Sequence, residues 1–220
     1  MAHGKLITIE GLDGAGKTTL ASALLTALRE WGVEAQLLRE PGGVRAAERI
    51  RDLVKDPGLR ISARAEALLY AAARAQLVEE ALAPLLDSGV TVLLDRFVDS
   101  SLAYQGAGRD LGMEPVARVN EFATGGLSPD LTLLLRVSPA VGRQRAHGRA
   151  DELDRLEQEP EAFFARIAAA YDALARAEPD RIRVLDAAQP PSAVLSAARA
   201  AIAPLFDPSR GKPSGRTIDQ

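Results

Sequence analysis

Apolar positions along the chain form short continuous runs that alternate with longer runs of helical spacing. The short runs lack regular polar alternation, which is typical of strands buried on both faces of a sheet. They predict strands at 5–10, 34–39, 90–95, 131–137 and 182–185. The longer runs predict helices at 17–31, 44–55, 63–87, 98–106, 113–124, 139–146, 160–177 and 191–205. This alternation predicts an α/β fold with a five-stranded parallel sheet flanked by helices.

Two segments depart from this pattern. Residues 143–155 are dense in charge, contain one glycine and have no apolar stripe, so we expect a surface loop or lid. Residues 207–220 are rich in Gly, Pro, Ser and charge, which predicts a disordered tail. The length of 220 residues is that of one ordinary domain, and we expect a single domain over residues 1–206.

Composition excludes several classes of protein. The chain has no cysteine, so a disulfide framework, a thiolate metal site and a cysteine nucleophile are excluded. Its formal net charge of −3 argues against a general binder of nucleic acid. The N-terminus lacks a signal-peptide pattern, and no run of about 18 apolar residues occurs, so we expect no membrane partner and a cytoplasmic location.

The most informative motif is GLDGAGKT at residues 11–18, which fits G-x-x-x-x-G-K-[ST] between a predicted strand and a predicted helix. Its glycines allow successive N–H groups to face a phosphate at the positive end of the helix. Lys17 would contact the outer phosphates, and the Thr18 hydroxyl would reach Mg²⁺. The loop predicts a nucleoside triphosphate site with Mg²⁺ as cofactor. The residues expected to bind the triphosphate, which is ATP in the family resemblance given below, are Gly11, Leu12, Asp13, Gly14, Ala15, Gly16, Lys17, Thr18 and Thr19.

Several classes of protein carry such a loop. A GTPase switch needs N-K-x-D, but the only asparagine is Asn120, within VNEF, so that class is excluded. A motor or partition ATPase would leave the motifs described next without a purpose. A small-molecule kinase needs a second anionic site near the loop and a means of excluding water.

The run VTVLLDRF at 90–97 supplies a candidate for that second site. A carboxylate at the C-terminal end of a strand faces the ligand crevice of an open α/β sheet. Asp95 is therefore expected in the Mg²⁺ shell, and Arg96 is expected to bind a second phosphate through its forked guanidinium. A surface ion pair is the alternative. Asp13, inside the glycine loop, is expected to orient a hydroxyl or Mg²⁺.

Two further motifs have both a functional and a purely structural interpretation. Tyr70 and Arg74 are four residues apart on one helix face, where they would stack a base and bond its edge. The alternative is a core tyrosine beside a solvated arginine. In REPGG, residues 39–43, Pro41 stiffens the chain and the two glycines allow close backbone approach, although a plain turn explains them as well.

Together these residues resemble the bacterial thymidylate kinases, a family of P-loop nucleoside monophosphate kinases. The similarity runs in order over about residues 5–205. Its most specific part is DRFVDSSLAYQGAGR at 95–109, because few other P-loop kinases carry D-R-[FY]-x-x-S-x-x-A-Y-Q. It is also carried by IEGLDGAGKTT, REPGG, LLYAAARAQ, PDLTLLL and ELDRLEQE.

The resemblance implies a three-layer P-loop NTPase fold and transfer of phosphate from MgATP to dTMP, giving dTDP and ADP in dTTP biosynthesis. It also implies a homodimer, and adenine bound near 186–192. Arg96 would bind the dTMP phosphate, Tyr70 would stack on thymine, and Tyr104 would lie near C2′ of the sugar. The implied dTMP-binding residues are Asp13, Glu40, Pro41, Tyr70, Arg74, Arg96, Ser100, Ser101, Tyr104 and Gln105.

The family has two designs, with a catalytic arginine either in the phosphate loop or in the lid. The loop position here is Gly14, while the lid segment holds Arg143, Arg145 and Arg149, so the chain resembles the lid-arginine type. Such an arginine would neutralise the transferring phosphoryl group on closure. The expected catalytic residues are Lys17, Arg96, Arg149, Arg145 and Asp13, and the expected metal ligands are Thr18, Asp95 and Asp13.

Two departures from the family pattern stand out. One extra residue precedes ELDR in the lid, and Arg136 stands where many relatives carry an acidic residue. The alternatives to a dTMP kinase are another deoxynucleotide or nucleoside kinase of the same fold, or a P-loop ATPase without a small acceptor. A monophosphate acceptor needs Arg96, whereas a nucleoside acceptor needs a base near its 5′-hydroxyl.

Overall fold

The computed structural model describes residues 3–147 and 155–207. Within them, five strands form one parallel sheet in the order β2-β3-β1-β4-β5. The strands are β1 (Leu6–Gly11), β2 (Ala35–Arg39), β3 (Thr91–Asp95), β4 (Leu131–Arg136) and β5 (Ile182–Asp186). Each lies within two residues of its predicted bounds, and the predicted α/β fold is confirmed.

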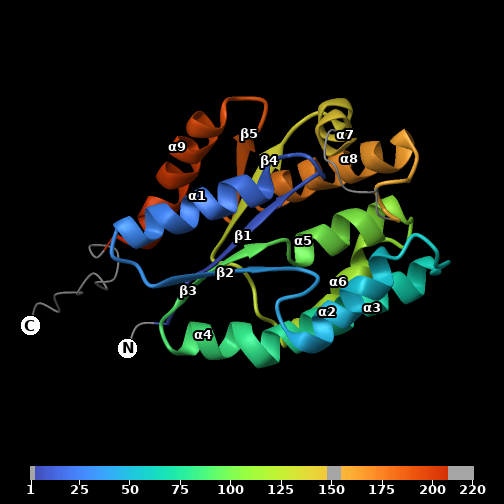
Figure 1. Cartoon of the computed structure of the whole chain (residues 1–220), viewed down its shortest axis with the longest axis horizontal. Coiled ribbons are helices and arrows are strands. Elements are labelled where there is room, and N and C mark those ends of the chain that lie inside the picture. Colours follow the sequence, from blue (N-terminus) through green and yellow to red (C-terminus); the bar gives the residue numbers. More distant parts are fainter. Residues whose placement is uncertain (1–2, 148–154, 208–220) are drawn as a thin grey trace, which may run out of the picture.

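Helices cover both faces of this sheet (Figure 1). One face carries α1 (Lys17–Glu30) and α9 (Pro191–Ile202), and the other carries α3 (Ala63–Leu77), α4 (Ala83–Asp87), α5 (Val98–Ser101) and α8 (Glu161–Ala177). Outside α3 lie α2 (Arg45–Lys55) and α6 (Met113–Thr124). Side chains of β1 alternate between the two faces of the sheet, which explains the two helical layers. Ile7 and Ile9 belong to the core cluster that contains Leu24 of α1, whereas Leu6 belongs to the cluster that contains Leu82, which follows α3 in the chain.

The strand order places β1 at the centre of the sheet, between β3 and β4. Residue Ile9 of β1 pairs with Asp95 of β3, so the glycine loop and the Asp95-Arg96 motif leave the sheet at the same edge. In open parallel sheets, ligands bind where neighbouring strands send their connections to opposite faces. The topology therefore builds its crevice between these two motifs.

The predicted helix at 63–87 is not one continuous α-helix. It consists of α3, a π-helical segment at Val78–Leu82, and α4. Pro84 follows the π-helical segment and has no N–H to donate to the preceding turn, which explains why regular α-helical bonding is interrupted there. The predicted helix at 98–106 likewise divides into α5 and a π-helical segment at Leu102–Gly108.

The charge-dense segment begins as a helix rather than a loop. Helix α7 runs over Pro139–His147, which confirms the predicted helix at 139–146 to within one residue, while the loop predicted from residue 143 is wrong for 143–147. The Arg143 guanidinium lies 5.5 Å from the centre of the Phe164 ring on α8, a cation–π contact that favours the longer helix. Arg149 and residues 208–220 lie outside the described residues. None of the described helices combines the length and the apolar character that crossing a membrane requires.

Candidate functional site

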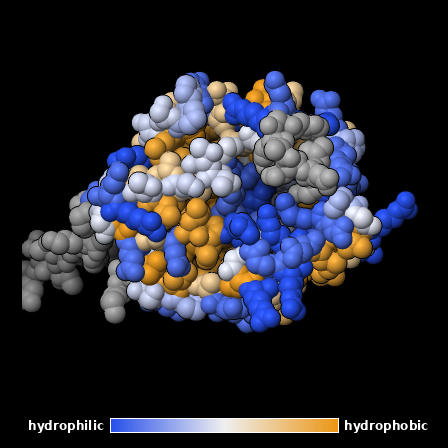
Figure 2. All heavy atoms as spheres, viewed as in Figure 1, coloured by the Kyte–Doolittle hydropathy of each residue, from blue (hydrophilic) through white to orange (hydrophobic). Residues whose placement is uncertain are grey.

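A cavity of about 660 Å³ opens at the carboxyl ends of β1 and β3. Figure 2 shows hydrophilic residues gathered around the hollow on this face of the molecule. Most of the residues that the sequence pointed to line the cavity. They are Asp13, Gly14, Gly16, Lys17, Thr18, Thr19, Glu40, Pro41, Tyr70, Arg74, Asp95, Arg96, Ser100, Ser101, Tyr104, Gln105 and Arg145.

The lysine of the glycine loop bonds back to the backbone of the loop itself. The Lys17 Nζ atom donates to the carbonyl oxygens of Gly11 at 3.1 Å and Leu12 at 2.9 Å. Gly16, which caps α1, has a φ of 95°, a left-handed conformation that glycine adopts without strain. Burial lowers the pKa of Lys17 to about 8, and the neighbouring Arg96 charge adds to this effect. Gly11, Leu12 and Ala15 shape the loop through their backbone and do not line the cavity.

Thr18 and Asp95 form the part of the site that fits Mg²⁺. The Thr18 hydroxyl donates to Asp95 Oδ2 at 3.1 Å. The other carboxylate oxygen, Asp95 Oδ1, is buried and has no hydrogen-bond partner among the described residues. Hydroxyl and carboxylate oxygens are the donors that Mg²⁺ prefers, and it usually completes its shell with substrate phosphates and water. These two side chains suit an ion that arrives with a nucleotide.

Asp13 of the glycine loop faces Arg96, which contacts the loop directly. Its Oδ1 accepts from Arg96 Nη2 at 2.5 Å, and its Oδ2 accepts from the Tyr104 hydroxyl at 2.8 Å. Burial by itself raises the pKa of Asp13, but the Arg96 and Lys17 charges and the Tyr104 hydroxyl together hold it well below its usual range. Asp13 is therefore a poor base, and both of its oxygens already have protein partners.

Arg96 has a fixed geometry with its charge directed toward the glycine loop. Its φ of 72° is left-handed, which is unusual for a residue with a Cβ. Nη1 donates to the Gly11 carbonyl at 3.2 Å and to Ser100 Oγ at 3.1 Å, while Nη2 contacts Asp13 and Tyr104. The guanidinium also lies 4.9 Å from the centre of the Tyr104 ring. This arrangement differs from the surface ion pair that was the alternative interpretation of Asp95-Arg96.

Arg74 is the most buried arginine of the site, with 2% of its surface exposed, so the alternative of a solvated arginine is wrong. Its donors reach Glu40, Ser101, Asn120 and the Phe97 carbonyl. All five N–H groups thus have protein acceptors. Arg74 lines the cavity. Its contact with the edge of a base stays a prediction, in which one N–H group would bond both the base and its present protein acceptor.

The rest of the predicted acceptor pocket surrounds this arginine. Glu40 Oε1 is buried and lacks a hydrogen-bond partner among the described residues. Burial raises the pKa of Glu40, against the charge of Arg74. Gln105 Nε2 donates to Glu66 at 2.9 Å, and half-buried Tyr70 lies at the cavity wall. The structure thus brings the predicted aromatic and polar side chains to one pocket.

Sequence reasoning missed several residues that line the cavity. They are Arg39, Arg51, Lys55, Leu156 and Glu157. The four-residue spacing of Arg51 and Lys55 on α2 was a signal of one basic helix face. Arg51 Nη1 donates to the Pro41 carbonyl at 2.9 Å, which ties α2 to the REPGG turn. Glu10, predicted only as part of a strand, contacts Ser100 and the N–H of Phe97, the residue after Arg96.

Comparison with known proteins identifies the family. The family model described as thymidylate kinase matches residues 9–198. A thymidylate kinase of Lactobacillus delbrueckii is 48% identical over 198 residues, covering 89% of this chain and 93% of the relative. The Deinococcus radiodurans thymidylate kinase is 49% identical, covering 86% and 92%, and that of Halorhodospira halophila is 46% identical, covering 96% and 99%. The chain belongs to the thymidylate kinase family.

Proposed function

We propose that the protein transfers the γ-phosphate of MgATP to dTMP, giving dTDP and ADP. The observation that carries this proposal is the position of Arg96, whose fixed guanidinium shares one cavity with the glycine loop. A phosphoryl donor bound by the loop and a monophosphate bound by Arg96 would meet across this cavity. Phosphoryl transfer consists mainly of such positioning and of charge stabilisation.

The donor side is formed by the loop N–H groups, Lys17 and the N-terminus of α1. Thr18 and Asp95 would hold Mg²⁺, which neutralises charge on the donor phosphates when bound. Arg145 Nη1 donates to the Ala187 carbonyl at 2.9 Å, so α7 is tied to the loop after β5. Pro191 of the same region also lines the cavity, which supports binding of adenine there.

The acceptor side is formed by Arg96 and the pocket around Arg74. Arg96 would orient the dTMP phosphate toward the donor, while Tyr70 stacks on the base. The dTMP phosphate is already an anionic nucleophile, so the reaction needs no general base. Lid arginines, Arg145 and Arg149, would neutralise the loose transition state as the site closes.

A nucleoside kinase of the same fold is a weaker candidate. A nucleoside acceptor needs a base beside its 5′-hydroxyl. Asp13 has the position for this role, but its lowered pKa makes it a weak base. Arg96, by contrast, suits a phosphate. These two features favour a monophosphate over a nucleoside.

We further propose that the enzyme is a cytoplasmic homodimer. Helices α3 and α6 pack side by side. Phe122 on α6 is 92% exposed, and Leu68 on α3 is 58% exposed. Apolar side chains so exposed on neighbouring helices are typical of a surface covered by a partner. Sedimentation of the wild type and of Phe122→Glu tests this proposal. A dimer that uses this surface should dissociate in the variant, whereas two proteins that both sediment as monomers would contradict it.

The activity is tested by ADP release from Mg²⁺-ATP with dTMP, dUMP, dCMP, dGMP, AMP and thymidine as parallel acceptors. We expect strong turnover with dTMP and weaker turnover with dUMP, because one methyl group contributes only about 1–3 kcal/mol of discrimination. The remaining acceptors should give little ADP. ADP release that is indifferent to every acceptor would favour a P-loop ATPase and contradict the role of Arg96.

A further inference from the structure

Glu10 is a buried carboxyl to which the proposed mechanism assigns no role. It lies on β1 directly before the glycine loop, with 0% of its surface exposed. Its Oε1 accepts from the Phe97 N–H at 2.7 Å and the Ser100 N–H at 3.3 Å. Its Oε2 accepts from Ser100 Oγ at 2.6 Å and from the Tyr171 hydroxyl at 2.9 Å.

These four donors are all neutral, so a carboxylate at this position costs more free energy than an uncharged side chain would. A buried carboxylate is destabilising unless its neighbours compensate for the lost water. Of the other inward residues of β1, Leu6, Ile7 and Ile9 are apolar and Thr8 carries a neutral hydroxyl that bonds Thr132, so Glu10 is the one ionisable side chain of this strand. Polar groups that break the local rule in this way occur mainly where function requires them.

The Glu10 carboxylate holds the backbone on the C-terminal side of Arg96. The Arg96 N–H donates to the Ile9 carbonyl at 3.0 Å, and the next N–H, that of Phe97, donates to Glu10. Two consecutive residues of β1 thus fix the backbone on both sides of the left-handed Arg96. Such a conformation persists only where the surroundings over-determine it.

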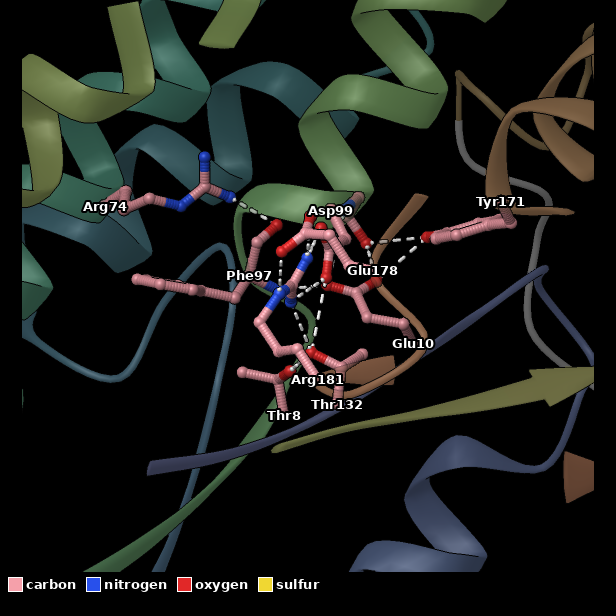
Figure 3. A network of polar contacts seen from close by, with 10 residues as sticks. Thr8, Glu10, Arg74, Phe97, Asp99, Thr132, Tyr171, Glu178 and Arg181 are labelled. Carbon is pink, nitrogen blue, oxygen red and sulfur yellow. Dashed lines mark hydrogen bonds and ion pairs between the residues drawn. The ribbon is translucent and has the colours of Figure 1, made fainter. Parts of the chain in front are cut away.

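A second link runs through the Ser100 side chain. Because Ser100 Oγ donates its proton to Glu10, its lone pair remains available to Arg96 Nη1 at 3.1 Å. The Glu10 carboxylate therefore sets the direction of the Ser100 hydroxyl. That hydroxyl in turn holds Nη1 of Arg96, the guanidinium nitrogen that does not contact Asp13. Figure 3 shows Glu10 facing Tyr171 from α8, next to the Asp99–Arg181 ion pair.

We propose that Glu10 is a positioning residue for phosphoryl transfer, which holds Arg96 in the conformation that receives the acceptor phosphate. This inference rests on the proposed function, in which Arg96 binds that phosphate. Glu10 itself does not line the cavity and is not expected to touch either substrate.

The positioning depends on the charge of Glu10. Burial, followed by repulsion from Asp99, raises the pKa of Glu10 to about 7, against the Ser100 hydroxyl, the Arg96 charge and the Phe97 N–H. A protonated Glu10 accepts less strongly from the Ser100 hydroxyl, so the contact between Ser100 and Arg96 weakens as the pH falls through 7. The titratable and charged groups facing it are Asp99 of α5 with its partner Arg181, Arg96 before α5, Tyr171 of α8 and Lys17 of α1.

The decisive variant is Glu10→Gln, which keeps the size of the side chain. Its single amide oxygen can accept from the fixed Phe97 N–H, but its NH₂ then faces Ser100 Oγ, so that hydroxyl can no longer donate to residue 10 and turns toward the Tyr171 oxygen at 3.0 Å. Thr8→Val is the matched control, since Thr8 lies two residues earlier on the same face of β1 and bonds Thr132 at 2.7 Å. For each protein, kcat and KM for dTMP and for ATP are measured from pH 6 to 8.5, together with thermal unfolding.

At pH 8 we expect Glu10→Gln to lower kcat/KM for dTMP by about 10- to 100-fold, the effect of one hydrogen bond to a charged group. The KM for ATP and the melting temperature should hardly change, and Thr8→Val should stay within about twofold. The ratio of wild type to Glu10→Gln should shrink toward pH 6, where Glu10 is protonated. Ionisation of dTMP itself cancels in this ratio.

A ratio near one at pH 8 would overturn the proposal, as would a constant ratio accompanied by a lower melting temperature. If Glu10→Gln does not fold, Tyr171→Phe serves instead, because it removes a donor to the carboxylate without touching the cavity. It should move the acidic limb of kcat/KM for dTMP to higher pH. An unmoved limb would overturn the proposal. Wild type inactive on dTMP would instead refute the proposed function.

Discussion

Replacement of Arg96 by lysine tests the acceptor site most directly. The guanidinium of Arg96 spans two sets of partners, with Gly11 and Ser100 on one arm and Asp13 and Tyr104 on the other. The single ammonium group of a lysine keeps the charge but occupies only one of these positions. It should remain with Asp13, and the contacts to Gly11 and Ser100 should be lost.

The magnitude follows from those two contacts. A hydrogen bond to a charged group contributes about 1.5–3 kcal/mol. The side chain is 16% exposed, so water replaces part of the loss and the lower end applies to each contact. The total of about 3 kcal/mol corresponds to about a 100-fold fall in kcat/KM for dTMP.

The assay is steady-state ADP release with dTMP varied at saturating MgATP, and with ATP varied at saturating dTMP. The KM for ATP should stay within about twofold of the wild-type value. Arg136→Lys is the matched control, because Arg136 is 55% exposed and pairs with Asp172 on the surface. If Arg96→Lys retained dTMP kcat/KM within about threefold of wild type, the assignment of Arg96 to the acceptor phosphate would be refuted.

Four further outcomes follow. Because burial lowers the pKa of Lys17 to about 8, ATP binding should take up about half a proton at pH 8 and weaken toward pH 9. Calorimetry in buffers of different ionisation enthalpy checks this, and zero uptake would contradict it. Asp95→Asn should raise the Mg²⁺ concentration for half-maximal rate about 10- to 100-fold in a metal titration. Asp99→Asn removes the charge that accepts from Arg181 at 2.7 and 2.9 Å, and should lower the free energy of unfolding by about 2 kcal/mol in urea at unchanged m. Arg149→Ala should lower kcat about 10³-fold with little change in KM for dTMP, and an unchanged kcat would remove it from catalysis.

Local patterns in the sequence were sufficient to predict the layers of the fold. Buried strands such as β1 and β4 are continuous apolar runs, and both were placed within a residue or two of their observed bounds. The glycine loop was equally predictable, because its conformation depends on the left-handed freedom of Gly16 and on the helix that follows. The interruption of 63–87 was missed because the apolar spacing continues through Pro84.

Only the tertiary structure determined which side chains of the site contact one another. Arg74 was one residue of a helix face, and only folding brings it Glu40, Ser101 and Asn120 from three other segments. Glu10 was predicted only as the last residue of a strand, yet it bonds Phe97 at a separation of 87 residues. Local spacing predicts which face of an element is buried, whereas these contacts depend on the order and register of β1 and β3, which place distant residues together and are set only when the whole sheet assembles.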